Sequence, residues 1–60
     1  MNDQKTLILR YAEILLIESR LVRGGERITQ ELIDEKHKIE SELSLSSDEI
    51  LKKARQMLSS

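Results

Sequence analysis

The sequence predicts an all-α protein, a helical hairpin followed by a short C-terminal helix. Apolar residues recur at helical spacing in three segments. The chain has no proline. Its two glycines are adjacent, at Gly24 and Gly25, and separate the first apolar segment from the second. Residues that cap helices precede the second and third segments. We therefore expect one domain, residues 1–60, with helices at about 3–23, 29–43 and 47–58.

The first expected helix carries most of the hydrophobic surface. Eleven of the sixteen residues from Leu7 to Val22 are apolar. Asn2 or Asp3 is expected to cap its N-terminus. Arg20 and Arg23 suit the negative end of the helix dipole, and the glycine pair then ends the helix.

The starts of the other two helices are marked by hydroxyl side chains. Thr29 can accept a hydrogen bond from the first turn of the second helix. Ser46, with Glu49 three residues later, forms a capping box, and Leu45 with Ile50 can pack across it as a hydrophobic staple. The hairpin loop is therefore expected at Gly24 to Ile28, with a start of the second helix at Glu26 as the alternative, and a shorter turn is expected before Ser46.

Placing the residues at about 100° per position separates the faces of each helix. The first helix has a broad main face, comprising Leu7, Ile8, Tyr11, Ile14, Leu15, Leu21 and Val22. The second helix has a narrower stripe, comprising Ile28, Leu32, Ile39 and Leu43. The third has an arc of Ile50, Leu51, Ala54, Met57 and Leu58. Leu9, Leu16 and Ile17 lie off the main face of the first helix, so the two other helices cannot cover them all.

Such an exposed apolar patch is typical of an interaction surface. A chain of this size buries only about 60% of its unfolded surface, and it has no cysteine and one histidine to supply a disulfide or a metal site. We therefore expect a homo-oligomer, with a two-fold dimer built around a helical bundle favoured, or a protein partner. The expected interface residues are Leu9, Leu16, Ile17, Ile8 and Leu15.

Glu18 conflicts with the pattern because it falls within the main apolar face of the first helix. If the chain reverses between the first two helices, positions whose numbers sum to about 53 lie opposite one another. Glu18 then lies within one turn of Lys36, which is itself out of place beside the apolar stripe of the second helix. We expect an ion pair that sets the register of the hairpin; the alternative is that Glu18 lies where the face opens to solvent.

The sequence provides no pattern for catalysis or for a cofactor. His37 has Asp34 and Glu40 at helical spacing, but the whole segment is charged, which favours a solvated surface over a metal site. The serines lack a nucleophile elbow, and the glycines follow a helix instead of a strand. No apolar run is long enough for a membrane span, which takes about 20 residues. We expect a non-enzymatic, cytoplasmic protein that needs no cofactor and acts through protein–protein interaction as an adapter, regulator or inhibitor.

A small DNA-binding regulator is the alternative. The third helix would then be the recognition helix, with Lys52, Lys53, Arg55 and Gln56 as its contacts. Against this, the net charge is −1, and the first turn of that helix carries Asp48 and Glu49.

Overall fold

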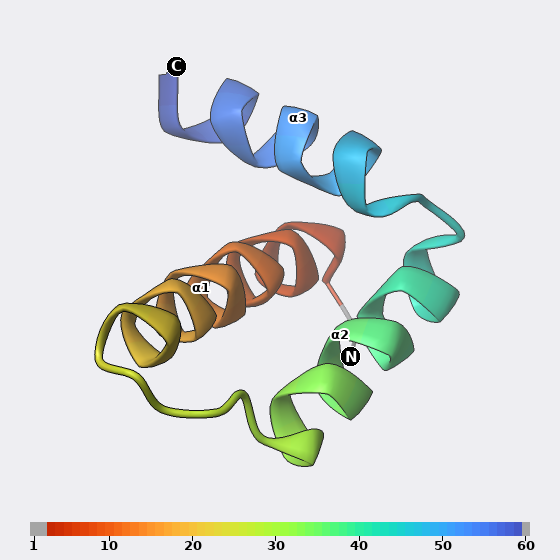
Figure 1. The fold of residues 1–60 in the computed structure, drawn as a ribbon. Coiled ribbons are helices and arrows are strands. Elements are labelled where there is room, and N and C mark those ends of the chain that lie inside the picture. The colour runs from red at the N-terminus through yellow and green to blue at the C-terminus, as the bar shows by residue number, and fades with distance from the viewer. Residues whose placement is uncertain (1–2, 60) are drawn as a thin grey trace.

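The computed structural model describes residues 3–59, which form three α-helices and no strand (Figure 1). Helix α1 spans Gln4–Arg23, α2 spans Gln30–Leu43 and α3 spans Ser47–Ser59. The predicted all-α class is therefore confirmed. No helix in this part of the chain has the length and apolarity needed to cross a membrane.

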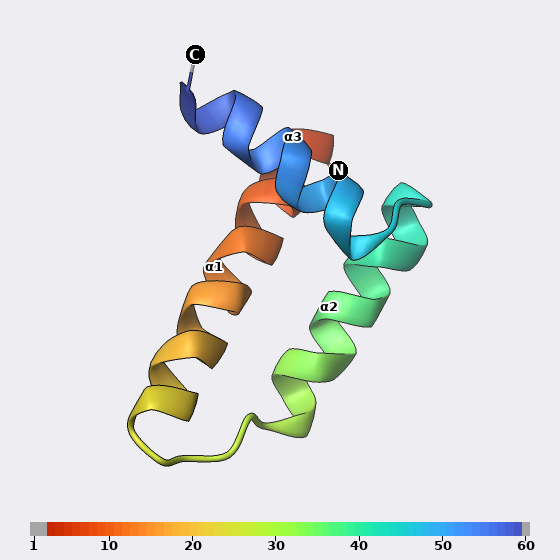
Figure 2. The same cartoon turned by 45° about the horizontal axis from the view of Figure 1, so that its top comes forward.

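Helix α1 is the centre of the arrangement. It runs antiparallel to α2 as one arm of a hairpin, and α3 crosses over its N-terminal half (Figure 2). Helix α1 packs against both other helices, whereas α2 and α3 have much less contact with each other. Helix α1 therefore takes part in most of the contacts that hold the three helices together.

Each helix begins one residue after its capping side chain. Asp3 accepts a hydrogen bond from the Lys5 amide at 3.2 Å. Thr29 accepts one from the Leu32 amide, and Ser46 one from the Glu49 amide, both at 3.4 Å. These bonds satisfy amides that have no partner within the helix. Of the two caps expected for α1, Asn2 lies outside the described residues.

The first two helices end in left-handed residues. At the end of α1 this residue is Gly25, with φ 76°, and the Glu26 amide donates to the Leu21 carbonyl at 2.8 Å. At the end of α2 it is Ser44, with φ 55°, although a side chain disfavours this conformation. Both reversals bend the chain sharply enough to return the next helix to α1.

The core lies where α2 and α3 meet α1. Its buried hydrophobic residues are Ile8, Tyr11, Ile14, Ile39, Ile50 and Ala54. Two residues expected on buried faces are instead exposed: Val22 at 62% and Leu58 at 74%. The helical wheel was wrong for them because α3 crosses only the N-terminal half of α1, so the C-terminal end of α1 has no cover from α3 and the C-terminal end of α3 extends beyond α1 (Figure 2).

Candidate functional site

An apolar groove lies between α1 and α3. Its volume is about 250 Å³, and its lining consists of Ala12, Leu15, Leu16, Leu51, Ala54, Arg55 and Leu58. All of these side chains except that of Arg55 are hydrocarbon. A groove of this kind on the surface of a small chain leaves apolar area in contact with water, which favours its use as a binding surface.

The groove follows from the spacing of residues on the two helices. On α3, Leu51, Arg55 and Leu58 are four and three residues apart and therefore share one side of the helix. On α1, Ala12 and Leu16 are one turn apart. The alanines give the groove a low floor, while Leu16 and Leu58 stand at its edges with exposed fractions of 62% and 74%.

The five residues expected at an intermolecular surface are not placed alike. Leu15 and Leu16 line the groove. Leu9 is exposed two turns before Leu16 on the same side of α1, and Ile17 is half-buried. Ile8, in contrast, belongs to the core of its own chain with only 4% of its surface exposed. The expectation for Ile8 is corrected accordingly: α3 covers it, so it has almost no surface to offer a second chain.

The α3 side of the groove was missed from sequence because Leu51 and Leu58 were assigned to the buried arc of their helix. Arg55, between them, was assigned to the polar side instead. A signal was available in the arc itself, which is wider than one crossing helix can cover. The outer residues of the arc, Leu51 and Leu58, line the groove together with the neighbouring Arg55.

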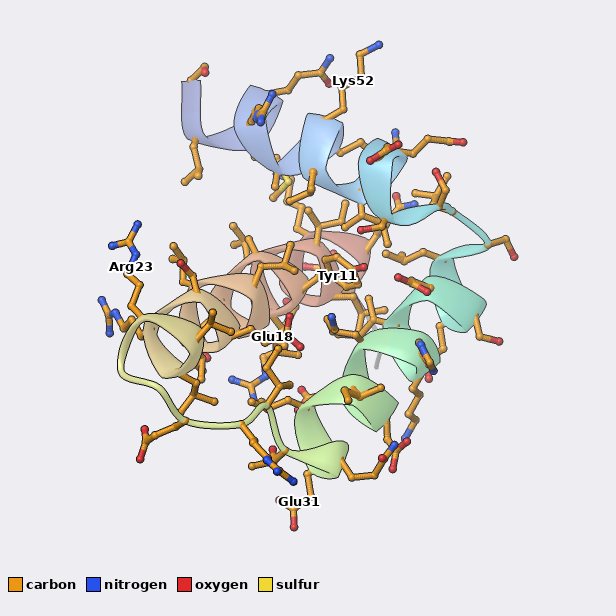
Figure 3. All side chains as sticks on the ribbon, viewed as in Figure 1. Tyr11, Glu18, Arg23, Glu31 and Lys52 are labelled. Carbon is orange, nitrogen blue, oxygen red and sulfur yellow. The ribbon has the colours of Figure 1, made fainter. Side chains whose placement is uncertain are left out.

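On the other side of α1, where it faces α2, polar contacts are present beside the apolar core. The Lys36 ammonium donates to Glu18 Oε1 at 2.8 Å, so the two residues predicted to pair do lie in contact. Glu18 is 7% exposed, and its Oε2 is buried without a hydrogen-bond partner among the described residues. Figure 3 shows Glu18 on the side of α1 toward α2. Burying a carboxylate is costly unless it is paired, so Lys36 is required where Glu18 is.

A second ion pair links the same two helices nearer the surface. The guanidinium of Arg10 donates to both oxygens of Glu35, at 2.6 and 3.0 Å. Arg10 also bonds Glu13 on its own helix. The hydrogen bond from Arg10 lowers the pKa of Glu35 below its usual value of 4.5. This pair was not predicted, because the two positions are offset by about two turns from the register that pairs Glu18 with Lys36.

Tyr11 joins all three helices. Its hydroxyl bonds the Glu40 carboxylate of α2 and lies 2.9 Å from the Ser47 hydroxyl of α3. Since a phenol has one proton and the carboxylate is the stronger acceptor, Tyr11 donates to Glu40 and accepts from Ser47. Burial raises the pKa of Tyr11, and the bond to Glu40 raises it further.

The residues proposed as nucleic-acid contacts do not form one strip. Lys52, Lys53 and Gln56 line a shallow depression of α3 together with Glu49, whereas Arg55 lies on the groove side. Lys52 points away from α1 (Figure 3). A carboxylate among the basic residues works against phosphate binding, because it repels the phosphates that they would attract.

Within residues 3–59 no cluster of three potential metal ligands is present, and His37 is exposed. No protein-family model matches the chain, and neither curated proteins nor solved structures give a significant match.

Proposed function

We propose that this chain is a non-enzymatic, cytoplasmic interaction protein, an adapter, regulator or inhibitor, which binds another polypeptide through the groove between α1 and α3. The observation that carries the proposal is the pairing of a hydrocarbon floor with two leucines that protrude into solvent, Leu16 and Leu58.

The groove offers the contacts that a helical partner uses. An amphipathic helix binds such a groove through apolar residues at positions i, i+3, i+4 and i+7. Each 100 Å² of apolar surface removed from water contributes about 2.5 kcal/mol before the costs of association. Covering Leu16 and Leu58 therefore provides a driving force that the polar faces of the chain do not.

The test is photo-crosslinking in cells that make the protein. A benzoyl-phenylalanine is placed at position 16 or 58, inside the proposed site, and at position 22 as the control. Val22 is as exposed as Leu16, at 62%, but does not line the groove. We expect discrete crosslinked products from positions 16 and 58 and none from position 22.

Equal crosslinking from all three positions would show that exposure alone is responsible and would overturn the proposal. The absence of any product from positions 16 and 58 would also overturn it, provided that circular dichroism shows the substituted chains to be folded.

A further inference from the structure

We propose that the polypeptide bound at the groove is a second copy of this chain, in a two-fold dimer whose α1 helices pack antiparallel around Leu16. This inference rests on the proposed function and adds the identity of the partner. Three observations carry it: the total exposed area, the shape of the groove and the charges on either side of Leu16.

The chain exposes more surface than a compact monomer of its mass. Its solvent-accessible surface is 4749 Å², whereas a globular monomer of 7.0 kDa exposes about 4000 Å². The excess of about 700 Å² approaches the ~800 Å² that each partner buries in an interface of standard size. Association with a copy of itself would therefore bring the exposed area per chain to the ordinary value.

The groove and its edges complement each other. Ala12 and Ala54 form a low floor, and the leucines at positions 16 and 58 project beside it. A two-fold axis places the same patch on both sides of an interface, so a patch must contain both the projection and the hollow that receives it. This patch contains both, which allows Leu16 and Leu58 of each copy to enter the groove of the other.

Charges on α1 are also arranged for an antiparallel copy. Glu13, Leu16 and Arg20 share one face of α1, since they are spaced by three and four residues. Two antiparallel α1 helices centred on Leu16 bring Glu13 of each copy opposite Arg20 of the other. Arg20 is exposed and forms no ion pair among the described residues. Glu13 contacts Arg10, which has Glu35 as a second partner, so Glu13 is able to turn to Arg20.

Sedimentation equilibrium on the purified full chain tests the partner directly. We expect a mass of twice 7.0 kDa for the unchanged protein at micromolar to millimolar concentration. Because of the two-fold axis, Leu16→Lys places two lysines in the interface. The dissociation constant of the dimer should therefore rise by at least about thirtyfold. Val22→Lys is the matched control, with the same exposure and the same added charge, and its dissociation constant should change by less than about twofold.

Charge exchange tests the antiparallel geometry. Glu13→Arg places like charges opposite each other at both ends and should weaken the dimer about tenfold. Adding Arg20→Glu to the same chain reverses both pairs, so the double variant should return to within about threefold of the unchanged protein. Failure of the double variant to recover would contradict the antiparallel arrangement.

A mass of 7.0 kDa at all concentrations would overturn the dimer. It would leave the proposed function standing if crosslinks from positions 16 and 58 led to a different protein. Equal weakening by Leu16→Lys and Val22→Lys would also overturn the inference, since the dimer would then not use the groove.

Discussion

The two sides of α1 hold their neighbours by different means. Toward α2, the contacts include two ion pairs, Lys36 with Glu18 and Arg10 with Glu35. Toward α3, the contacts are mainly apolar and centre on Ile50 and Ala54, which are buried against the face of α1 that carries Ile8. On the side toward α2, Arg10 and Glu18 of α1 form ion pairs within the chain, whereas the side toward α3 continues into a groove lined mainly by hydrocarbon side chains.

The two kinds of contact act differently: the ion pairs fix the alignment of α1 and α2, whereas the apolar contacts are less selective. Hydrogen-bonded ion pairs require particular atoms at particular distances, so they select one alignment of α1 and α2. Apolar contacts are not directional, and they accept any surface of suitable shape. Helix α3 uses part of the apolar surface of α1, and the remainder stays available to another chain.

The largest expected effect is that of Ile50→Ala, on the apolar side. Ile50 is fully buried, so removing its side chain beyond Cβ leaves a cavity against α1. We expect a loss of about 3 kcal/mol from the free energy of unfolding, measured by urea titration. Because few polar contacts hold α3, its amides should lose protection from hydrogen exchange before those of α2. Equal loss of protection in both helices would contradict the proposed difference between the two sides.

The next largest effect is expected on the polar side, from Lys36→Met. It leaves the buried carboxyl group of Glu18 without its ion-pair partner, and we expect a loss of about 2 kcal/mol in urea unfolding. Glu18→Gln should cost only about 1 kcal/mol, because the Lys36 side chain is 21% exposed and its ammonium can reach water. Combining Glu18→Leu with Lys36→Met removes both charges and should restore most of the loss. If both single variants cost the same, the buried carboxylate does not control this contact.

The sequence was most informative where a local signal and a periodic pattern agreed. Thr29 and Ser46 marked the starts of two helices, because N-caps are local hydrogen bonds. The hairpin register that pairs Glu18 with Lys36 followed from loop position and helical rise. The same register places Glu40 within a turn of the position opposite Tyr11, so that contact too could have been found.

The exposure of side chains at the helix ends could not be predicted from the sequence. Val22 and Leu58 have the periodicity of buried residues, yet both are exposed. Their environment depends on the angle at which α3 crosses α1, and that angle is set by how side chains of two helices interlock. A helical wheel describes one helix at a time, so it predicted the apolar faces but not which part of each face would be covered.

A smaller effect is expected for Tyr11→Phe, at the point where both sides of α1 meet. The change removes the hydroxyl that bonds Glu40 and Ser47, and we expect a loss of about 1 kcal/mol. The pKa of Tyr11 is raised above 10.0, so its contribution to stability is complete below pH 10 and is lost as the pH rises through the folded value. Stability of the unchanged protein should therefore fall more steeply above pH 10 than that of Tyr11→Phe. Parallel curves would show that the phenol is not confined as described.

The smallest effect is expected for Glu35→Gln, which breaks the more exposed ion pair of the polar side. The side chains of Arg10 and Glu35 are each 38% exposed, so solvent and salt screen their attraction. The pKa of Glu35 is lower in the folded chain than its usual 4.5. Its contribution is therefore present above about pH 4.5 and lost as the pH falls through the folded value. The difference in urea midpoint between the unchanged protein and Glu35→Gln should thus be seen at pH 7, shrink as the pH falls through the folded pKa of Glu35 and shrink also in 1 M salt. Glu26→Gln, which makes the same change of charge in the loop, should show no such dependence. A difference that is unchanged in 1 M salt would mean that Glu35 stabilises the hairpin through packing, and the polar side of α1 would then resemble the apolar side more closely than its ion pairs indicate.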